Sequence, residues 1–118
     1  MQLVHHPVSG EPEVLADDIE FANTWLSRAR GLMFRSSFPQ GAALIFEFDS
    51  NRSRSIHMLF VAFPIDALWL DDEEVTRVAR LRSWVGLARG RGDTIIECPA
   101  GACDEVKVGD RVTLSPSD

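Results

Sequence analysis

The alternation of apolar and polar positions changes twice along the chain. Most of the chain consists of short apolar runs separated by polar or Gly- and Pro-containing breaks, which is the pattern of β-strands. Between them lies one stretch whose apolar residues recur at helical spacing: Trp25, Leu26, Ala29, Leu32 and Met33. This spacing predicts one helix. Asn23 or Thr24 can cap its start, and Gly31 either ends it or lets it pack closely against a sheet.

The remaining pattern predicts a mainly β fold. Strands are expected at Glu13–Ala16, Ile19–Ala22, Ala43–Phe48, Ser55–Phe60, Ile65–Leu70, Val75–Leu81, Thr94–Cys98 and Arg111–Leu114, and Leu3–His5 is a candidate for one more near the N-terminus. The polar segment Asp49–Ser53 and the Gly-rich segment Ser83–Asp93 are expected to be loops between strands. Seven or eight short strands with one helix predict a mainly β (α+β) protein. We expect a small antiparallel barrel or sandwich whose helix covers an end or an edge.

The length of 118 residues predicts a single domain over residues 1–118. Pro7, Gly10 and Pro12 indicate that residues 1–12 form a loosely held N-terminal arm, and residues 115–118 are expected to be a frayed tail.

No apolar stretch approaches the ~18 residues of a membrane-spanning helix, because Pro64 and Asp66 interrupt the longest one. The first ten residues contain no basic segment followed by an apolar run. We therefore expect a cytoplasmic protein without a secretory signal and without a membrane partner.

The chain is acidic, with a formal net charge of −6. Binding to nucleic acid requires a basic face, so no nucleic-acid partner is expected. The basic residues are nevertheless clustered between Val75 and Gly92, a segment without any acidic residue that contains Arg77, Arg80, Arg82, Arg89 and Arg91. This segment is either a solvated basic face or a local site for a small anion.

Several short motifs occur in a fixed order over residues 21–112. They are Gly31-Leu32-Met33-Phe34-Arg35, Gly41 with Leu44–Phe48, Met58, Pro64-Ile65-Asp66, Glu97 with Pro99-Ala100-Gly101, and Gly109-Asp110. In this order and spacing the chain resembles the domain-of-unknown-function 192 family. The resemblance implies a compact β-rich domain with no agreed activity, cofactor or partner. The chain departs from the family's commonest pattern at His57, where many members have Trp, and at Phe60, where many have Asn.

Asp66 and His57 are the candidates for proton transfer. Asp66 lies in an otherwise apolar predicted strand, and a carboxylate there is either half-exposed or buried with a partner, because an unpaired buried charge costs too much free energy. It is therefore a general acid or base, a ligand anchor, or a structural group paired with Arg35, Arg30 or loop amides. His57 can approach it from an adjacent strand, but no nucleophile-elbow pattern accompanies the pair.

Cys98 and Cys103 flank a short Pro- and Gly-containing segment. A zinc site would require two more ligands at suitable spacing, and His5 and His6 are weak candidates, so neither a metal nor a cofactor is predicted. In a reducing compartment two free thiols are expected, and a disulfide that closes a short loop is the alternative.

The segment Ser83–Asp93 combines Trp84 with two arginines and three glycines. Gly-rich loops bind phosphates through backbone amides, and Trp with Arg suits planar or sugar ligands. A mobile connection whose Trp packs on the barrel explains the pattern equally well. The candidate ligand-binding residues are Arg35, Asp66, Arg80, Arg82, Trp84, Arg89 and Arg91.

Three functions of different classes fit these observations. The first is a non-catalytic module that binds a small anionic or sugar-like ligand through the candidate residues. The second is a hydrolase-type enzyme in which Asp66 and His57 share proton transfer. The third is an interaction module that offers a strand edge or an apolar rim to a protein partner. The first is preferred because the sequence lacks a catalytic constellation and has a local charge feature.

Overall fold

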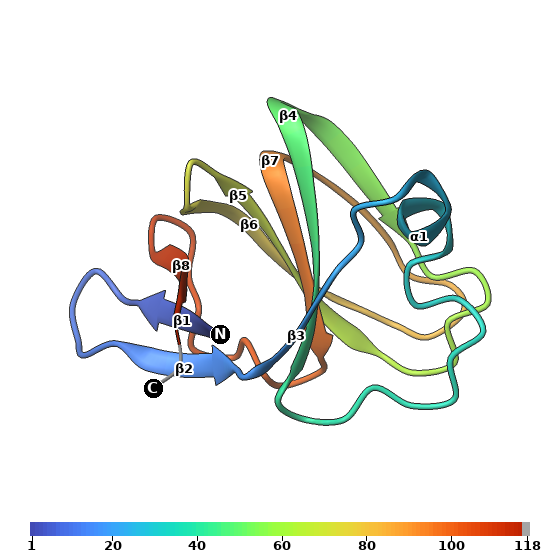
Figure 1. Cartoon of the computed structure of the whole chain (residues 1–118), viewed down its shortest axis with the longest axis horizontal. Coiled ribbons are helices and arrows are strands. Elements are labelled where there is room, and N and C mark those ends of the chain that lie inside the picture. Colours follow the sequence, from blue (N-terminus) through green and yellow to red (C-terminus); the bar gives the residue numbers. More distant parts are fainter. Residues whose placement is uncertain (117–118) are drawn as a thin grey trace.

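The computed structural model describes residues 1–116, except for the side chains of Trp25 and Leu26. Strands and one helix follow one another along the chain (Figure 1): β1 Gln2–His6, β2 Glu13–Ala16, β3 Asp18–Phe21, α1 Trp25–Arg30, β4 Ala42–His57, β5 Ile65–Asp71, β6 Glu74–Leu81, β7 Leu87–Pro99 and β8 Arg111–Ser115. The prediction of a mainly β fold with one helix is confirmed. No helix among the described residues is long and apolar enough to cross a membrane.

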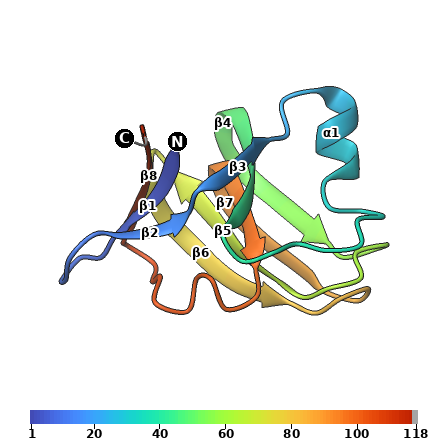
Figure 2. The same ribbon diagram turned by 60° about the horizontal axis from the view of Figure 1, so that its bottom comes forward.

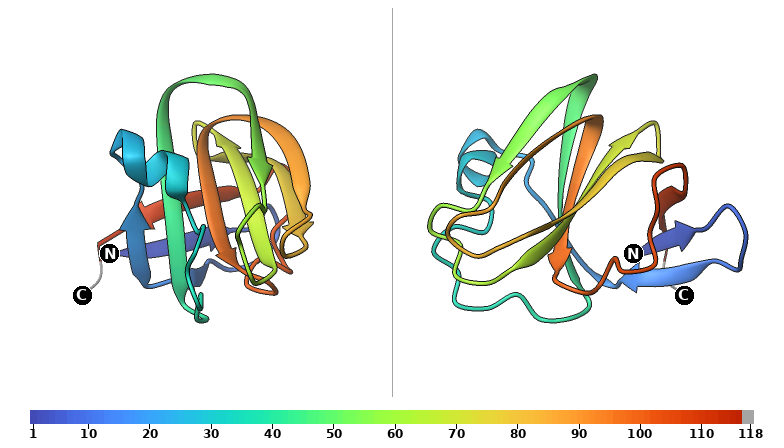
Figure 3. Two further views of the ribbon diagram at one scale, coloured as in Figure 1. Left: turned by 90° about the vertical axis from the view of Figure 1, so that its right-hand side faces the viewer. Right: turned by 180° about the vertical axis from the view of Figure 1, so that it is seen from behind.

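All of these strands belong to one sheet, with the order β2-β1-β8-β6-β5-β7-β4-β3. Every adjacent pair is antiparallel except β3 and β4, which run parallel. The sheet is open, and it is strongly curved, so that β1, β2 and β8 turn away from the long strands β4 and β7 (Figures 2 and 3).

The sheet has an apolar cluster on each face. Side chains alternate along a strand, so Ile65, Ala67 and Trp69 of β5 belong to a first core, whereas Leu68 and Leu70 belong to a second core. The first core lies toward α1 and the segment after it, because Leu32 packs there. The second core joins β5 to β1 and β8.

The Gly-rich segment 83–93 was predicted to be a loop, and this prediction is wrong from Leu87 onward. In β7, Arg89 pairs with Ser55 of β4, and Arg91 pairs with Ser53. The pairing depends on glycine: a Cβ added at Gly90 would lie 2.5 Å from the Trp69 ring, and one at Gly92 would meet the Leu70 backbone. The glycines therefore allow close packing rather than a mobile turn.

The predicted break at Asp49–Ser53 is also wrong. β4 runs continuously from Ala42 to His57, with an irregular register between Glu47 and Arg52. Within this segment Arg52 and Ser53 pair with Gly92 and Arg91 of β7, and the irregular register falls on the residues before them.

The helix is shorter than its apolar spacing predicted. Thr24 forms a capping box with Ser27, as expected for one of the two proposed caps. Gly31 has a φ of 51° and ends the helix, so Leu32 and Met33 lie in the turn that follows.

Residues 2–6 are not a loosely held arm. β1 pairs with both β2 and β8, and Leu3 and His5 are buried. His5 Nε2 lies 2.7 Å from an Asp110 carboxylate oxygen, and that carboxylate also accepts hydrogen bonds from the Val8 and Lys107 amides. Of the expected frayed tail, Ser115 belongs to β8, and residues 117–118 lie outside the described residues.

The contact between His5 and Asp110 should make the fold sensitive to acid. Burial by itself would raise the pKa of Asp110, but the His5 and amide hydrogen bonds outweigh it and hold this pKa below its ordinary value. A lowered pKa contributes stability that is present above the unfolded-state pKa of about 3.9 and is lost as the pH falls through the folded-state pKa.

We therefore expect Asp110→Asn to lower the free energy of unfolding by about 1–3 kcal/mol at pH 7 and to flatten its decline below about pH 4. Urea unfolding between pH 3 and 7 measures both effects. The exposed Asp18→Asn serves as the control, and equal acid sensitivity of Asp110→Asn and the parent protein would contradict the assignment.

Candidate functional site

The arginines proposed as one ligand site are dispersed in the structure. Arg35 forms an ion pair with Glu20, and Arg80 forms ion pairs with Asp66 and Asp104. Arg89 donates to the Ser55 hydroxyl. Arg91 borders a shallow groove together with Arg77 and Lys107, and Arg82 and Trp84 are exposed elsewhere.

Asp66 is buried and fully engaged in hydrogen bonds. Its Oδ1 accepts from Arg80 Nε at 2.8 Å, and its Oδ2 accepts from the Gly101 and Cys103 amides at 3.0 Å each. The charged partner of Asp66 is therefore Arg80 of the neighbouring strand β6. The sequence analysis had proposed Arg35 or Arg30, and neither is the partner. The amides belong to the turn after β7, so the carboxylate joins this turn to β5 and β6.

His57 does not approach this carboxylate. Asp66 lies on the face of β5 opposite to Ile65, whereas His57 and Ile65 both line a pocket on the other face. His57 is exposed, and its Nδ1 accepts from the Leu59 amide. The hypothesis of shared proton transfer between Asp66 and His57 therefore receives no support from their positions.

Cys98 and Cys103 are free, and both are buried. A hydrogen bond with Cys103 raises the pKa of the Cys98 thiol above its ordinary value, and burial raises it further. Because the thiolate is the reactive and metal-binding form, Cys98 is a poor nucleophile. Among the described residues, no group of three or more His, Cys, Asp or Glu side chains could hold a metal ion.

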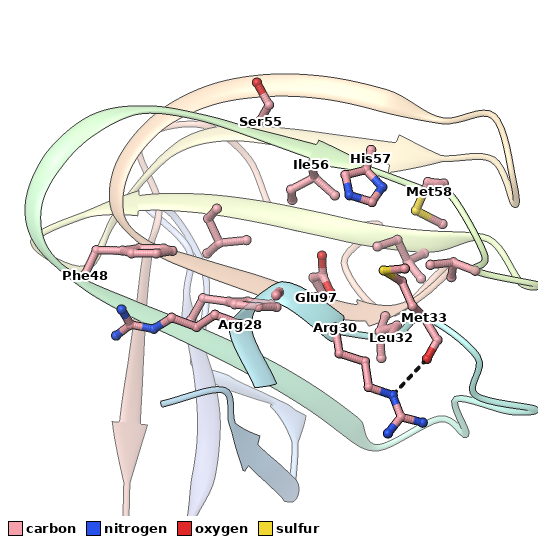
Figure 4. Close-up of a pocket in the computed structure, with 16 residues that line it drawn as sticks. Arg28, Arg30, Leu32, Met33, Phe48, Ser55, Ile56, His57, Met58 and Glu97 are labelled. Carbon is pink, nitrogen blue, oxygen red and sulfur yellow. Dashed lines mark hydrogen bonds between the residues drawn. The ribbon is translucent and has the colours of Figure 1, made fainter. Parts of the chain in front are cut away.

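An apolar pocket opens between α1 and the sheet, and it extends into the first core. Its volume is about 180 Å³. The segment 28–33 forms one wall, and β4 forms another through Phe46, Phe48 and Ile56 (Figure 4). α1 ends at Gly31, and Leu32 and Met33 of the turn that follows complete this wall of the pocket.

Glu97 lines this pocket from β7 (Figure 4). Its neighbours in the sheet are Leu44 and Ala67, and the residue is only 6% exposed. Among the described residues its carboxyl group makes no hydrogen bond. Burial raises the pKa of Glu97 to about 7, and the positive charge of Arg35 opposes this only in part. The carboxyl group therefore stays protonated to a higher pH than an exposed glutamate does.

Two arginines on α1 border the same pocket, and both are held in place. Arg28 donates to the carbonyl oxygens of Ala22 and Glu47, and its guanidinium lies 5.1 Å from the centre of the Phe48 ring. Arg30 Nε donates to the Met33 carbonyl (Figure 4). These contacts place positive charge beside the pocket, where it disfavours a cationic ligand.

Sequence reasoning did not single out Glu97 as a site residue, although a signal was present. Glu97 is a carboxylate in the predicted strand Thr94–Cys98, as Asp66 is in its own strand. The two differ in their surroundings: Asp66 has a cation and two amides, whereas Glu97 has an apolar cavity. Only the packing of α1 reveals this difference.

Comparison with known proteins identifies the family of this chain. The family model DUF192, described as "Uncharacterized ACR", matches residues 6–114. The UPF0127 protein of Pyrococcus abyssi is 35% identical over 100 residues, which are 80% of this chain and 83% of the relative. The UPF0127 protein of Thermococcus sibiricus is 32% identical over 98 residues, which are 80% of this chain. The alignment spans 64% of that relative, less than two thirds of its length.

Two solved structures share the fold. One is a Sinorhizobium meliloti protein described as "a putative transcription regulator", with a TM-score of 0.81, 20% identity, and coverage of 95% of this chain and 91% of that one. The other is a Novosphingobium aromaticivorans protein of unknown function, with a TM-score of 0.80, 22% identity, and coverage of 96% and 84%. The resemblance to the domain-of-unknown-function 192 family is confirmed: this chain belongs to the DUF192 family.

Proposed function

We propose that the chain is a non-catalytic binding module for a small, mostly apolar molecule that carries one uncharged hydrogen-bonding group. The observation that carries this proposal is the buried Glu97 carboxyl group, which has no hydrogen bond among the described residues and lines an apolar pocket. A carboxyl group that is largely buried, makes no hydrogen bond and has its pKa raised beside a cavity is a candidate for ligand recognition.

The volume of the pocket limits the size of the ligand. A dry cavity of about 150 Å³ accommodates benzene, so a pocket of about 180 Å³ accommodates one ring with a short substituent. A sugar or a nucleotide is too large and too polar for these walls. The small anionic or sugar-like ligand expected at the arginine-rich segment is therefore not the ligand we propose.

The charge of the site selects the polar group of the ligand. A carboxyl group with a pKa of about 7 is largely protonated in mild acid, and in that form it both donates and accepts a hydrogen bond. Arg28 and Arg30 beside the pocket disfavour a cation. An alcohol or an amide satisfies both conditions.

Four ring compounds of similar size test this choice by NMR titration at pH 6: benzyl alcohol, benzylamine, benzoate and toluene. We expect benzyl alcohol to bind most tightly, with a dissociation constant on the order of millimolar, and to shift the resonances of Ile95 and Ile56. Glu97→Leu should remove the preference for benzyl alcohol over toluene. Glu47→Gln, which changes an exposed carboxylate outside the pocket, is the control. The absence of any shift with all four compounds would refute the proposal.

Glu97 should also reduce the stability of the free protein at neutral pH. Its pKa is raised in the folded state, so unfolding releases a proton above about pH 4.3, and stability declines as the pH rises from there to about 7. Glu97→Gln should remove this decline and raise the free energy of unfolding at pH 8 by on the order of 3 kcal/mol.

Urea unfolding at pH 5 and pH 8 measures this difference. A gain of stability on replacing Glu97 is typical of a residue kept for function. If Glu97→Gln were less stable than the parent protein at pH 8, Glu97 would be a structural group, and the binding proposal would lose its main support.

A further inference from the structure

We propose that one end of the molecule docks on the surface of an anionic lipid bilayer through an aromatic tip. The aromatic tip consists of Phe34, Leu59, Phe60, Trp84, Val85 and Leu87. All six are exposed, and Phe34 and Trp84 are 66% and 52% exposed. They come from the segment after α1, the segment before β5, and the segment before β7 together with the first residue of β7. These parts gather at the end remote from both termini (Figure 1).

The aromatic tip is a built surface, since its segments are bonded to one another. The Phe34 amide donates to the Phe60 carbonyl at 2.9 Å, and the Trp84 amide donates to the Val61 carbonyl at 3.0 Å. The Phe34 and Phe60 rings stack with centroids 4.9 Å apart, and the Trp84 ring meets the edge of Phe60 at 6.3 Å. An exposed apolar patch of this kind marks a contact surface.

The backbone at this surface supports the same conclusion. Phe34, Phe60 and Trp84 have φ values of 67°, 61° and 67°, in the left-handed region that bulky side chains rarely adopt. Such strain persists where the surrounding structure imposes it, and it concentrates at functional sites. Glycine or asparagine would adopt the same backbone conformation with less strain. The aromatic side chains at these positions therefore indicate a contact with a partner.

The charge of the aromatic tip indicates which kind of partner binds there. Residues 31–38, 58–64 and 82–87 contain no acidic residue and two arginines. Arg35 is paired with Glu20, whereas Arg82 makes no ion pair among the described residues. A second copy of the chain would bring its own Arg82 toward this Arg82, and the two charges would repel. A sugar is disfavoured because the tip lacks the carboxylate and amide side chains that bind sugar hydroxyl groups. Trp, Phe and Leu beside Arg are instead the residues of a membrane–water interface, and anionic headgroups attract the unpaired Arg82.

The net charge of −6 does not prevent this contact. The acidic turn at Asp71–Glu74 lies at the other end of β5 from the aromatic tip. The strand segment Ile65–Leu70 separates them by roughly 20 Å, which exceeds the screening length of ~8 Å at physiological salt. The expectation of no membrane partner rested on the lack of a spanning segment, and surface docking does not need one.

Vesicle sedimentation in 150 mM NaCl tests the proposal, with vesicles of phosphatidylcholine alone or with about one third phosphatidylglycerol. We expect the protein to sediment with the anionic vesicles and much less with the neutral ones. The variant with Phe34→Asn, Phe60→Asn and Trp84→Asn should bind about a hundredfold more weakly, and it should remain folded because Asn tolerates the left-handed backbone.

Three further variants identify the contact. Val8→Asn with Val108→Asn removes exposed apolar side chains outside the tip and should leave sedimentation unchanged. Arg82→Glu should reduce binding only to the anionic vesicles. Glu97→Gln should bind vesicles like the parent protein, so the vesicle result can be interpreted independently of the proposed ligand pocket. Retention of the parent protein in the supernatant, or equal sedimentation of the triple variant, would overturn the proposal and leave a protein partner as the occupant.

Discussion

Replacing Asp66 by Ala should lower the free energy of unfolding by about 3 kcal/mol or more. The substitution leaves the Gly101 and Cys103 amides without the carboxylate oxygen that accepts from both at 3.0 Å, and the Cys103 amide lies in a buried part of the protein. Hydrogen bonds from a buried amide to a charged group are worth more than neutral ones, and an amide left unsatisfied loses its solvation as well. The Arg80 ion pair adds less, because the Arg80 side chain is 52% exposed.

Graded variants separate these contributions. Asp66→Asn retains an oxygen that can accept from both amides and loses the ion pair, so it should cost only about 1–2 kcal/mol. Asp104→Ala, which removes the second, exposed partner of Arg80, should cost less than about 1 kcal/mol. Urea unfolding at pH 7 compares the three. If Asp66→Ala were as stable as the parent protein, the carboxylate would have to be assigned to a site instead of to the fold.

The sequence predicted that Asp66 needs a partner, but it could not identify Arg80. A tight turn at Asp72-Glu73 pairs Asp71 with Glu74, and this register would place Ala79 opposite Asp66. The register shifts by one residue between Trp69 and Leu70, and Arg80 therefore pairs with Asp66. A β-bulge moves side chains to the other face of a strand, and local composition does not reveal its position.

The strand pattern was more informative for β5, β6 and β8 than for β7. β5 is apolar throughout except for Asp66 and its last residue, and β6 and β8 carry branched apolar residues at short intervals between recognisable turns. The segment Leu87–Asp93 alternates small, basic and glycine residues, and its strand conformation depends on β4 and on the Trp69 ring. The candidate site could be predicted only in part for the same reason. The sequence shows a carboxylate in a strand at Glu97, but the cavity beside it depends on how α1 packs against the sheet.

Replacing Gly90 by Ala should lower the free energy of unfolding by about 3 kcal/mol. The new Cβ would lie 2.5–2.8 Å from three atoms of the Trp69 indole. Trp69 is completely buried, and its Nε1 donates to the Arg54 carbonyl, so the ring cannot move without losing contacts in the first core. Gly92→Ala should be at least as costly, because its Cβ would meet the Leu70 backbone, which has no rotamer to change.

The sign of these two effects distinguishes a packed strand from a mobile loop. In a loop, Gly→Ala is neutral or adds about 0.4–1 kcal/mol by restricting the unfolded chain. Arg89→Ala and Arg91→Ala alter exposed side chains of the same segment and should change stability by less than about 0.5 kcal/mol. Urea unfolding of the four variants makes the comparison. Neutral alanines at both glycines would mean that β7 does not pack against Trp69, and the pocket that β7 shares with α1 through Glu97 would then have no fixed wall.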